Sequence, residues 1–186
     1  MQTPCHIEVG ESLRGEQQYL CCYCESEITL ADSHIEHMAP RSAAPALAYE
    51  YSNLACSCNG GIVEHCGRFK DDRHHNPAYR YDAPRFVRPH DPATRPWFRY
   101  LPDGTVVPAP GLNEQDYAKA EYMIGYLGLN CSRLCGRRHG HAQAIIQTLG
   151  PSPDIALIQR LTNYWLTPNA AGKLKSFFSL SETVLT

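Results

Sequence analysis

The sequence predicts an α+β protein with a small, mixed, cysteine-rich N-terminal part and a helical C-terminal third. Six of the nine cysteines fall between positions 21 and 66, whereas helical periodicity begins only at Asn113. The 186 residues, 43% of them apolar, are enough for one domain with its own core. We therefore expect one compact unit, in which residues 1–112 form the cysteine-rich part and residues 113–186 a helical extension.

Several helices are expected after residue 112. The first begins at the N-cap Asn113 and ends at Gly128. Its expected buried face has apolar residues at helical spacing: Tyr117, Ala120, Ile124 and Leu127. A second helix capped by Asn130, a third over about residues 153–166 and a short last one near Phe177 complete the extension.

The segment between the two parts is expected to be irregular, and it ends in a hairpin. Residues 76–96 contain five prolines, which disfavour regular structure. After them, WFRYLPDGTVVP has the Asp103-Gly104 turn and the aromatic and β-branched flanks of a β-hairpin. Residues 68–99 carry a net charge of +4 with interleaved aromatics. Such a segment either follows phosphates and stacks on bases or is a solvated connection.

Overall composition excludes some classes of protein. A formal net charge of −2 excludes a generic basic coat for nucleic acid. No apolar run approaches the ~20 residues of a membrane span. The N-terminal sequence lacks the basic start and apolar stretch of a signal peptide. We expect a cytoplasmic protein without membrane partners, whose clustered thiols bind metal rather than form disulfides.

A zinc site is expected among the clustered cysteines. Cys21 and Cys24 have the C-x-x-C spacing that lets two thiolates reach one Zn²⁺. The second pair is expected from Cys58 and Cys66, with Cys22 and Cys56 as substitutes. In the C-terminal part, three residues share one helical face and are either a second zinc site or ordinary helix residues: Cys131, Cys135 and His139.

Four short elements, in this order, resemble the zinc-containing HNH (ββα-metal) endonucleases. They are the C-x-x-C pair, then Glu36-His37 with Pro40, then Asn53-Leu54 with Cys58 five residues after Asn53, and last Cys66 with Lys70. The runs CCYCE, HIEHMAPRS, NLACSC and HCGRFK, followed by FRYLPDGTV and MIGYLGLNCSRLCGRR, are similar to the HNH subfamily of retron and Septu-type anti-phage systems. The resemblance covers about residues 13–138 and implies a zinc-stapled ββα-metal nuclease core.

The resemblance also implies roles for individual residues. His37 would be the general base, because a neutral imidazole accepts a proton near pH 7. Glu36 would be the carboxylate ligand of a catalytic Mg²⁺ or Mn²⁺, and Asn53 would orient His37 through a hydrogen bond. His34, close by on the strand, is interpreted as an ordinary strand residue. The zinc in the cysteine site would be structural.

One position departs from the pattern. Many HNH nucleases have a His or Asn directly after the last cysteine as a second ligand of the catalytic metal, but this chain has Gly67. The replacement is open between His65, Asp71 and Asn59, and the sequence does not choose among them.

The function implied by the resemblance is metal-dependent cleavage of nucleic acid, with DNA favoured over RNA, as the effector of an anti-phage defence system. The implied partners are an ABC/SMC-like ATPase subunit and, in retrons, a reverse transcriptase with its msDNA. Region 113–166 is the expected ATPase-binding surface, with exposed Tyr122, Tyr126 and Trp165. The alternative, supported by Gly67, is a non-catalytic zinc module that binds protein or nucleic acid.

Overall fold

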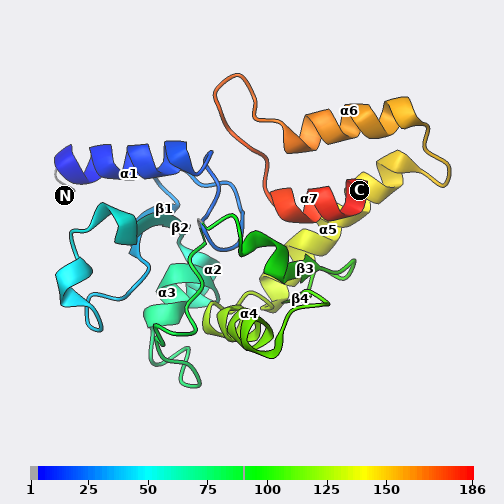
Figure 1. Cartoon of the computed structure of the whole chain (residues 1–186). Coiled ribbons are helices and arrows are strands. Elements are labelled where there is room, and N and C mark those ends of the chain that lie inside the picture. The colour runs from blue at the N-terminus through cyan, green and yellow to red at the C-terminus, as the bar shows by residue number, and fades with distance from the viewer. Residues whose placement is uncertain (1–3, 90) are drawn as a thin grey trace.

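The computed structural model describes residues 4–89 and 91–186 (Figure 1). The N-terminal elements are α1 (Pro4–Glu16), β1 (Ser33–His37), the 3-10 turns η1 (Pro45–Leu47) and η2 (Tyr51–Asn53), β2 (Leu54–Cys58), α2 (Gly60–Val63) and α3 (Cys66–Asp71). After them come η3 (Arg95–Trp97), β3 (Phe98–Tyr100), β4 (Val106–Pro108), α4 (Glu114–Tyr126), α5 (Ser132–Leu149), α6 (Ile155–Leu166) and α7 (Phe178–Leu185).

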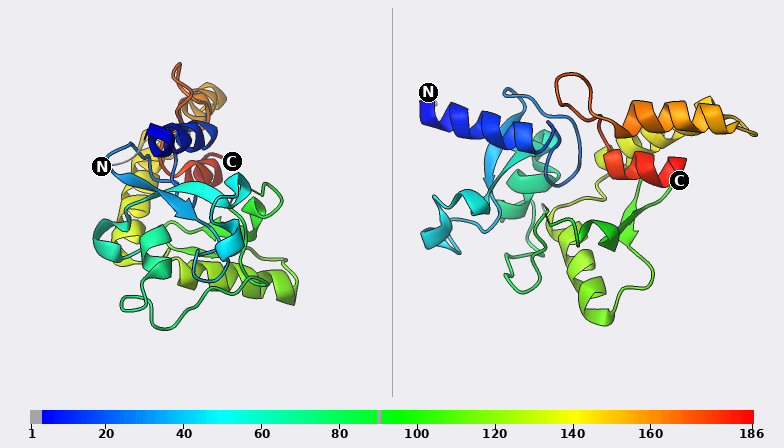
Figure 2. Two further views of the ribbon diagram at one scale, coloured as in Figure 1. Left: turned by 90° about the vertical axis from the view of Figure 1, so that its left-hand side faces the viewer. Right: turned by 45° about the horizontal axis from the view of Figure 1, so that its top comes forward.

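A two-stranded hairpin with a helix on each face forms the centre of the N-terminal part. β1 and β2 pair antiparallel, from Ser33 opposite Cys58 to His37 opposite Leu54. Figures 1 and 2 show α1 on one side of the hairpin and α3 on the other. Because side chains alternate along a strand, Ile35 faces α1, whereas the residues on either side of it face α3.

Helix α1 was not expected from the sequence. Its residues lack a clear apolar stripe, and Leu13 is its one strongly apolar residue that is buried. Its packing uses a small residue: Cys56 donates from Sγ to the carbonyl of Gly10 at 3.4 Å. The helix is therefore stabilised by close backbone approach to β2 rather than by a periodic apolar face.

The expected hairpin before the helical part is present. β3 and β4 pair antiparallel around Gly104, whose φ of +84° is a conformation that favours glycine. Asn130 does not cap a helix, so that prediction is wrong. Its side chain accepts from Val106 N and donates to Val106 O, both at 2.8 Å, and Cys131 takes the N-cap position of α5. Two bonds to the hairpin backbone replace the single bond that a cap provides.

Helix α4 begins as expected at Asn113, which accepts a hydrogen bond from Asp116 N. Its buried surface includes a second stripe, in which Tyr122 and Tyr126 are 3% and 1% exposed. Tyr117 is 46% exposed, so the prediction that this residue lies on the buried face is wrong. The segment before the hairpin covers this second stripe, and Tyr122 donates from its hydroxyl to Arg80 O at 2.6 Å. The prediction that Tyr122 and Tyr126 are exposed is therefore wrong.

The last two helices pack together and return the chain to its N-terminal part. Asp154 caps α6, and Trp165 of this helix is half-buried against His141. The expected last helix is present but begins only at Phe178. The segment before it runs beside the first cysteines, where Leu174 N donates to Gln18 O and Phe177 N donates to Glu25 O. Both parts contribute to one hydrophobic cluster, and the division at residues 112 and 113 stays a prediction.

Over residues 4–89 and 91–186, no helix is both long enough and apolar enough to cross a bilayer.

Candidate metal and nuclease site

Four cysteine side chains converge at the base of the β1–β2 hairpin. Their sulfur atoms all lie within 4.8 Å of one another: Cys21, Cys24, Cys58 and Cys66. The Sγ–Sγ distances are 3.8 Å between Cys21 and Cys66 and 3.7 Å between Cys24 and Cys58. A tetrahedral Zn²⁺ with Zn–S bonds of about 2.3 Å requires sulfur separations of about 3.8 Å. The structure thus brings together the four expected ligands in an arrangement that fits zinc.

Position separates these thiols from their neighbours, whereas acidity does not, because a hydrogen bond with Cys21 raises the pKa of Cys58 and burial raises the pKa of Cys66. In the cluster, a hydrogen bond with Cys21 raises the pKa of Cys24, but hydrogen bonds from Cys58 and Cys66 outweigh it and bring that pKa down to about 6. Burial instead raises the pKa of Cys56 to about 11. The proposed substitutes, Cys22 and Cys56, lie outside the group of four. Thiolates are the form that binds metal, so the acidity of Cys24 suits a ligand.

Glu36 is the centre of a second cluster on the α3 side of β1. Its Oε1 receives Lys70 Nζ at 2.8 Å and the Tyr23 hydroxyl at 3.1 Å, and its Oε2 lies 3.3 Å from His34 Nε2. Glu36 is 3% exposed, and the Lys70 side chain is fully buried. We call Tyr23, His34, Glu36 and Lys70 the Glu36 cluster.

The charges in the Glu36 cluster compensate one another. Burial raises the pKa of Glu36, but the hydrogen bond from His34 and the charge of Lys70 outweigh burial, so the pKa lies below its usual value. Burial lowers the pKa of Lys70, and the charges of Glu36 and Asp71 more than reverse this effect. A buried carboxylate therefore stays ionised here with one oxygen held by a buried ammonium.

Gly67 lies directly against the carboxylate. A Cβ at this position would lie 2.2 Å from Glu36 Oε2 and 3.0 Å from His34 Nε2. A side chain at position 67 would require the Glu36 carboxylate to move, although Lys70 and Tyr23 hold that carboxylate in place. α3 approaches β1 so closely because position 67 has no side chain.

The residues that the sequence offers as the second ligand of the catalytic metal have other hydrogen-bond partners: His65, Asp71 and Asn59. His65 Nδ1 lies 3.1 Å from Cys66 Sγ, which places its ring at the thiol cluster. Asp71 accepts from Lys70 Nζ at 2.8 Å, and burial raises its pKa. Asn59 Oδ1 lies 3.3 Å from His34 Nδ1. Asp71 and Asn59 thus reach the Glu36 cluster only through Lys70 and His34, and His65 belongs to the cysteine cluster.

His37 ends β1 and points away from the Glu36 cluster. Its Nε2 lies 3.0 Å from the carbonyl oxygen of Ala48. Because a carbonyl only accepts, Nε2 carries the proton and Nδ1 keeps the lone pair of the neutral ring. The loop that supplies Ala48, residues 38–53, is named the His37 loop below.

Asn53 closes the His37 loop. Its Oδ1 accepts from Ala39 N at 2.8 Å, and its Nδ2 donates to Ala39 O at 3.1 Å and to Leu47 O at 3.2 Å. In the described part of the chain, these bonds stand in place of the expected bond from Asn53 to the His37 ring. Asn53 thus fixes the turn of the loop that brings the Ala48 carbonyl to His37.

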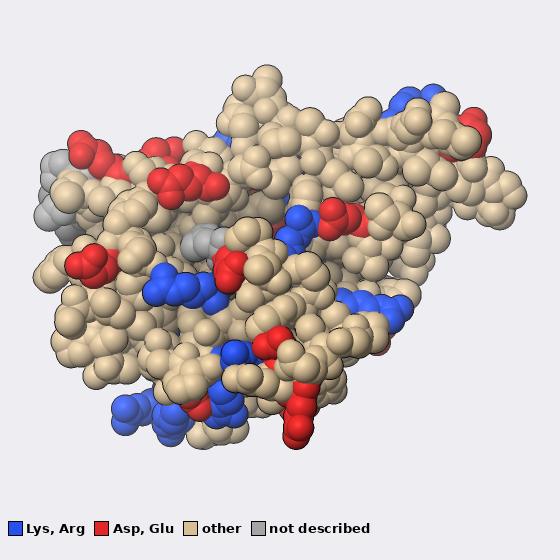
Figure 3. All heavy atoms as spheres, viewed as in Figure 1, with Lys and Arg blue, Asp and Glu red and all other residues tan. Residues whose placement is uncertain are grey.

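A broad hollow lies beside Lys70 and Asp71, with a volume of about 690 Å³. Residues of the His37 loop, α3 and the proline-rich segment line it, and its basic members are Arg41, Lys70, Arg73 and Arg80. Figure 3 shows Lys and Arg side chains at the lower left, where Figure 1 places α3 and the chain after it, and acidic side chains over α1. The basic character expected for residues 68–99 therefore gathers beside the site.

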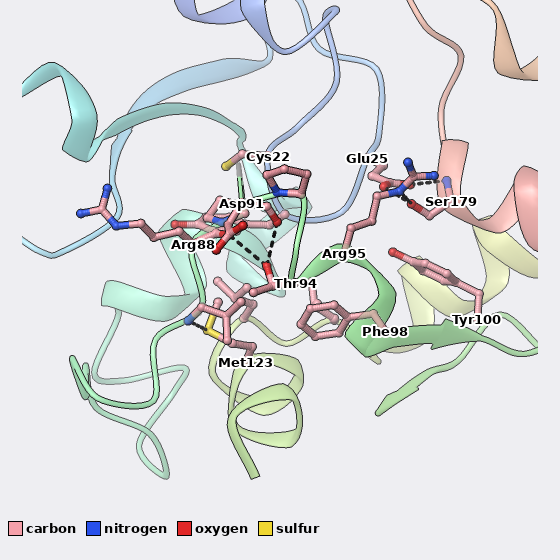
Figure 4. Close-up of a pocket in the computed structure, with 16 residues that line it drawn as sticks. Cys22, Glu25, Arg88, Asp91, Thr94, Arg95, Phe98, Tyr100, Met123 and Ser179 are labelled. Carbon is pink, nitrogen blue, oxygen red and sulfur yellow. Dashed lines mark hydrogen bonds between the residues drawn. The ribbon is translucent and has the colours of Figure 1, made fainter. Parts of the chain in front are cut away.

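A smaller cavity of about 160 Å³ is lined by residues next to the first cysteines, by the proline-rich segment and by α4 (Figure 4). Its charged lining is already paired, since Arg95 binds Glu182 and Ser179. The cavity contains none of the expected catalytic residues, Glu36, His37 and Asn53.

The possible second zinc site does not assemble. Within residues 4–89 and 91–186, the only group of three or more ligand side chains within 4.8 Å is the four-cysteine cluster. His139 Nδ1 lies 2.7 Å from the carbonyl oxygen of Pro102, which the ring can only donate to. The three residues of this expected site instead contribute to the packing of α5 on the hairpin of β3 and β4: Cys131, Cys135 and His139.

Sequence reasoning overlooked three contributors to the site. Tyr23 and Lys70 were noted as parts of motifs without a role, and His34 was interpreted as an ordinary strand residue. The signal that identifies His34 is its position two residues before Glu36, which places both side chains on one face of a strand.

Comparison with known proteins gives one informative relative. No family model matches the chain. Over 146 residues, the chain is 29% identical to a protein of Vibrio cholerae serotype O1 biovar El Tor that is named "Retron Vc95 putative HNH endonuclease". The similar region covers 76% of this chain and 66% of the relative. The chain is thus similar to a protein named as an HNH nuclease of a retron and spans about two thirds of its length.

Proposed function

We propose that this protein is a metal-dependent HNH endonuclease that hydrolyses phosphodiester bonds in nucleic acid, DNA before RNA, as the effector of an anti-phage system. β1, β2 and α3 would be its ββα-metal core. The observation that carries the proposal is the ionised, buried Glu36 one residue before His37, on a strand tied to the four-cysteine cluster. Similarity to the retron relative supports the same class.

The residues around Glu36 fit a hard divalent cation such as Mg²⁺ or Mn²⁺. Lys70 and Tyr23 occupy Oε1 and hold the carboxylate in one orientation, which leaves Oε2 as the ligand atom. A cation held there would supply positive charge to the scissile phosphate and to the leaving oxygen. Zn²⁺ in the cysteine cluster would be structural, because four thiolates leave no open position.

His37 would act as the general base. The proton on Nε2 is directed to Ala48, so Nδ1 is the atom that accepts a proton from the attacking water. The Ala48 carbonyl also stabilises the imidazolium that results. Arginines of the neighbouring hollow, Arg41, Arg73 and Arg80, would contact the phosphates that flank the cleaved bond.

The partners and location are also part of the proposal. We infer a cytoplasmic complex with an ABC/SMC-like ATPase and, in a retron, with a reverse transcriptase and its msDNA. Tyr122 and Tyr126 are excluded from this contact by their burial. Helix α6 offers the better surface, because Ile155 and Tyr164 are 74% and 57% exposed.

A non-catalytic zinc module is the second candidate. The observation that favours it is the Lys70 ammonium, which already neutralises Glu36. Such a module would bind nucleic acid through the basic hollow without cleaving it.

The test is cleavage of DNA and RNA substrates with Mg²⁺ or Mn²⁺ by zinc-loaded protein, alone and with the ATPase. We expect His37→Ala to lower the rate by about 10²–10⁴ while zinc content and thermal stability stay unchanged. His74→Ala, which replaces an exposed histidine, is the matched control. Binding of nucleic acid without cleavage by the wild-type complex would favour the zinc module instead.

A further inference from the structure

We propose that His34 supplies the nitrogen ligand of the catalytic cation that position 67 lacks. The ligand pair would then be His34 and Glu36, both on β1, in place of one ligand on the strand and one on the helix. The inference rests on the proposed metal dependence, and it concerns a residue to which the family resemblance gives no role.

The first observation is the distance between the two ligand atoms. His34 Nε2 and Glu36 Oε2 lie 3.3 Å apart on the same face of β1. Two neighbouring ligands of an octahedral ion with bonds of about 2.1 Å lie about 3 Å apart. The pair therefore needs only a small adjustment to bind one ion together.

The second observation is the orientation of the His34 ring. Nδ1 lies 3.3 Å from Asn59 Oδ1 and Nε2 lies 3.3 Å from Glu36 Oε2, and both oxygens only accept, so the single proton of a neutral ring satisfies one of the two contacts. A metal ion between Nε2 and Oε2 would satisfy the second contact and leave the ring proton on Nδ1 for Asn59. A histidine oriented by a neighbouring acceptor is also the usual arrangement of a metal ligand.

The third observation is the steric relation to Gly67. The missing Cβ of this residue would contact both Glu36 Oε2 and His34 Nε2. The helix backbone thus occupies the space from which a ligand at position 67 would reach the ion. The close packing of α3 on β1 thus accounts both for the absence of a ligand at Gly67 on the helix and for the use of His34 on the strand.

Access to solvent completes the argument. The His34 side chain is 24% exposed, whereas Lys70 and Tyr23 cover the other carboxylate oxygen. A cation bound by His34 and Glu36 would keep open positions on the solvent side for water and phosphate. A site that is closed on one side and open on the other suits catalysis.

The experiment measures Mn²⁺ binding to the zinc-loaded full chain, independently of cleavage. Titration followed by EPR gives the affinity, and pulsed EPR detects a directly bound ¹⁴N. We expect wild type to bind one Mn²⁺ with an imidazole ¹⁴N coupling. His34→Ala should lose the coupling and at least tenfold in affinity, whereas His37→Ala should keep both.

A second variant separates the loss of a metal ligand from a loss of the fold. His34→Asp offers an oxygen ligand in place of nitrogen, so we expect Mn²⁺ binding to persist without the ¹⁴N coupling. Unchanged coupling in His34→Ala or His34→Asp, or loss of coupling in His37→Ala, would overturn the assignment. Wild-type protein that binds no Mn²⁺ would overturn it too. If wild type binds Mn²⁺ through His34 but cleaves no nucleic acid, the proposed function fails and the ligand assignment stands.

Discussion

The Glu36 cluster and the His37 loop start from adjacent residues of β1, yet they are stabilised in different ways. Three side chains hold Glu36, which is almost fully buried. His37 is half-buried and contacts a backbone carbonyl, in a loop that Asn53 closes through backbone groups. The first region depends on the identity of its side chains and the second on the conformation of its loop. Substitutions should therefore affect stability in the first and the position of the base in the second.

The largest effect should come from removing a zinc ligand, because it breaks both regions at once. Cys58→Ser should cause unfolding or aggregation, since structural zinc sites contribute about 10–16 kcal/mol in small peptides. Zinc content by mass spectrometry and secondary structure by circular dichroism are the measurements. Cys5→Ser, at an exposed thiol, is the control and should keep zinc and fold. A folded Cys58→Ser protein that retains zinc would contradict a four-cysteine site.

Loss of Lys70 should come next and should act on the Glu36 cluster. Lys70→Met leaves the Glu36 carboxylate buried without its counter-charge, which typically costs about 3–5 kcal/mol. Urea unfolding at neutral pH measures the change. The double variant Lys70→Met/Glu36→Gln removes both charges and should recover much of the stability. Equal destabilisation in the single and the double variant would argue against the ion pair as the cause.

A methyl group at position 67 should have a smaller effect on the same cluster. Gly67→Ala places a Cβ against Glu36 and should reduce the free energy of unfolding by about 1–3 kcal/mol. Gly136→Ala is the matched control, because nothing lies within 4 Å of the added Cβ in α5, and it should stabilise by about 0.5–1 kcal/mol. If Gly67→Ala and Gly136→Ala shift the urea midpoint by the same amount, position 67 has room for a methyl group between α3 and β1.

The effect on stability in the His37 loop should be no larger than the effect at position 67. Asn53→Ala removes three hydrogen bonds to backbone groups and should cost about 1–3 kcal/mol, partly because the Ala39 and Leu47 groups lose their partners. Cleavage should fall more than stability, since the Ala48 carbonyl no longer fixes the imidazole. Measured kcat and urea midpoints separate these effects. A variant that loses stability but keeps kcat would show that the loop does not position His37.

The sequence was informative where chemistry follows from spacing. The four-cysteine cluster, the turn at Gly104 and the cap at Asn113 could be predicted because each depends on residue type at a fixed separation. Burial of Tyr122 could not, since a stripe beside the helical apolar face is covered by a segment far away in sequence.

The same limit applies to the candidate site. The motif identified Glu36 and His37 but not the direction of their side chains. Strand alternation alone pairs Glu36 with His34, while the contacts of Asn53 depend on how a loop of irregular sequence folds. The role of Gly67 was hidden because a glycine has no side chain to suggest a contact, and only its distance to Glu36 explains it.

The return of the chain to the first cysteines has a consequence for protein synthesis. Glu27 N donates to Ser176 Oγ, a residue 149 positions later, and Ser179 N donates to Glu25. Ribosomes add about 5–20 residues per second, so about 7–30 s separate the emergence of these two segments. During that interval Cys21 and Cys24 are available to zinc without the cover that α7 and its preceding segment later provide. A metal ion bound by the cluster would therefore find Cys21 and Cys24 uncovered until the returning segment docks.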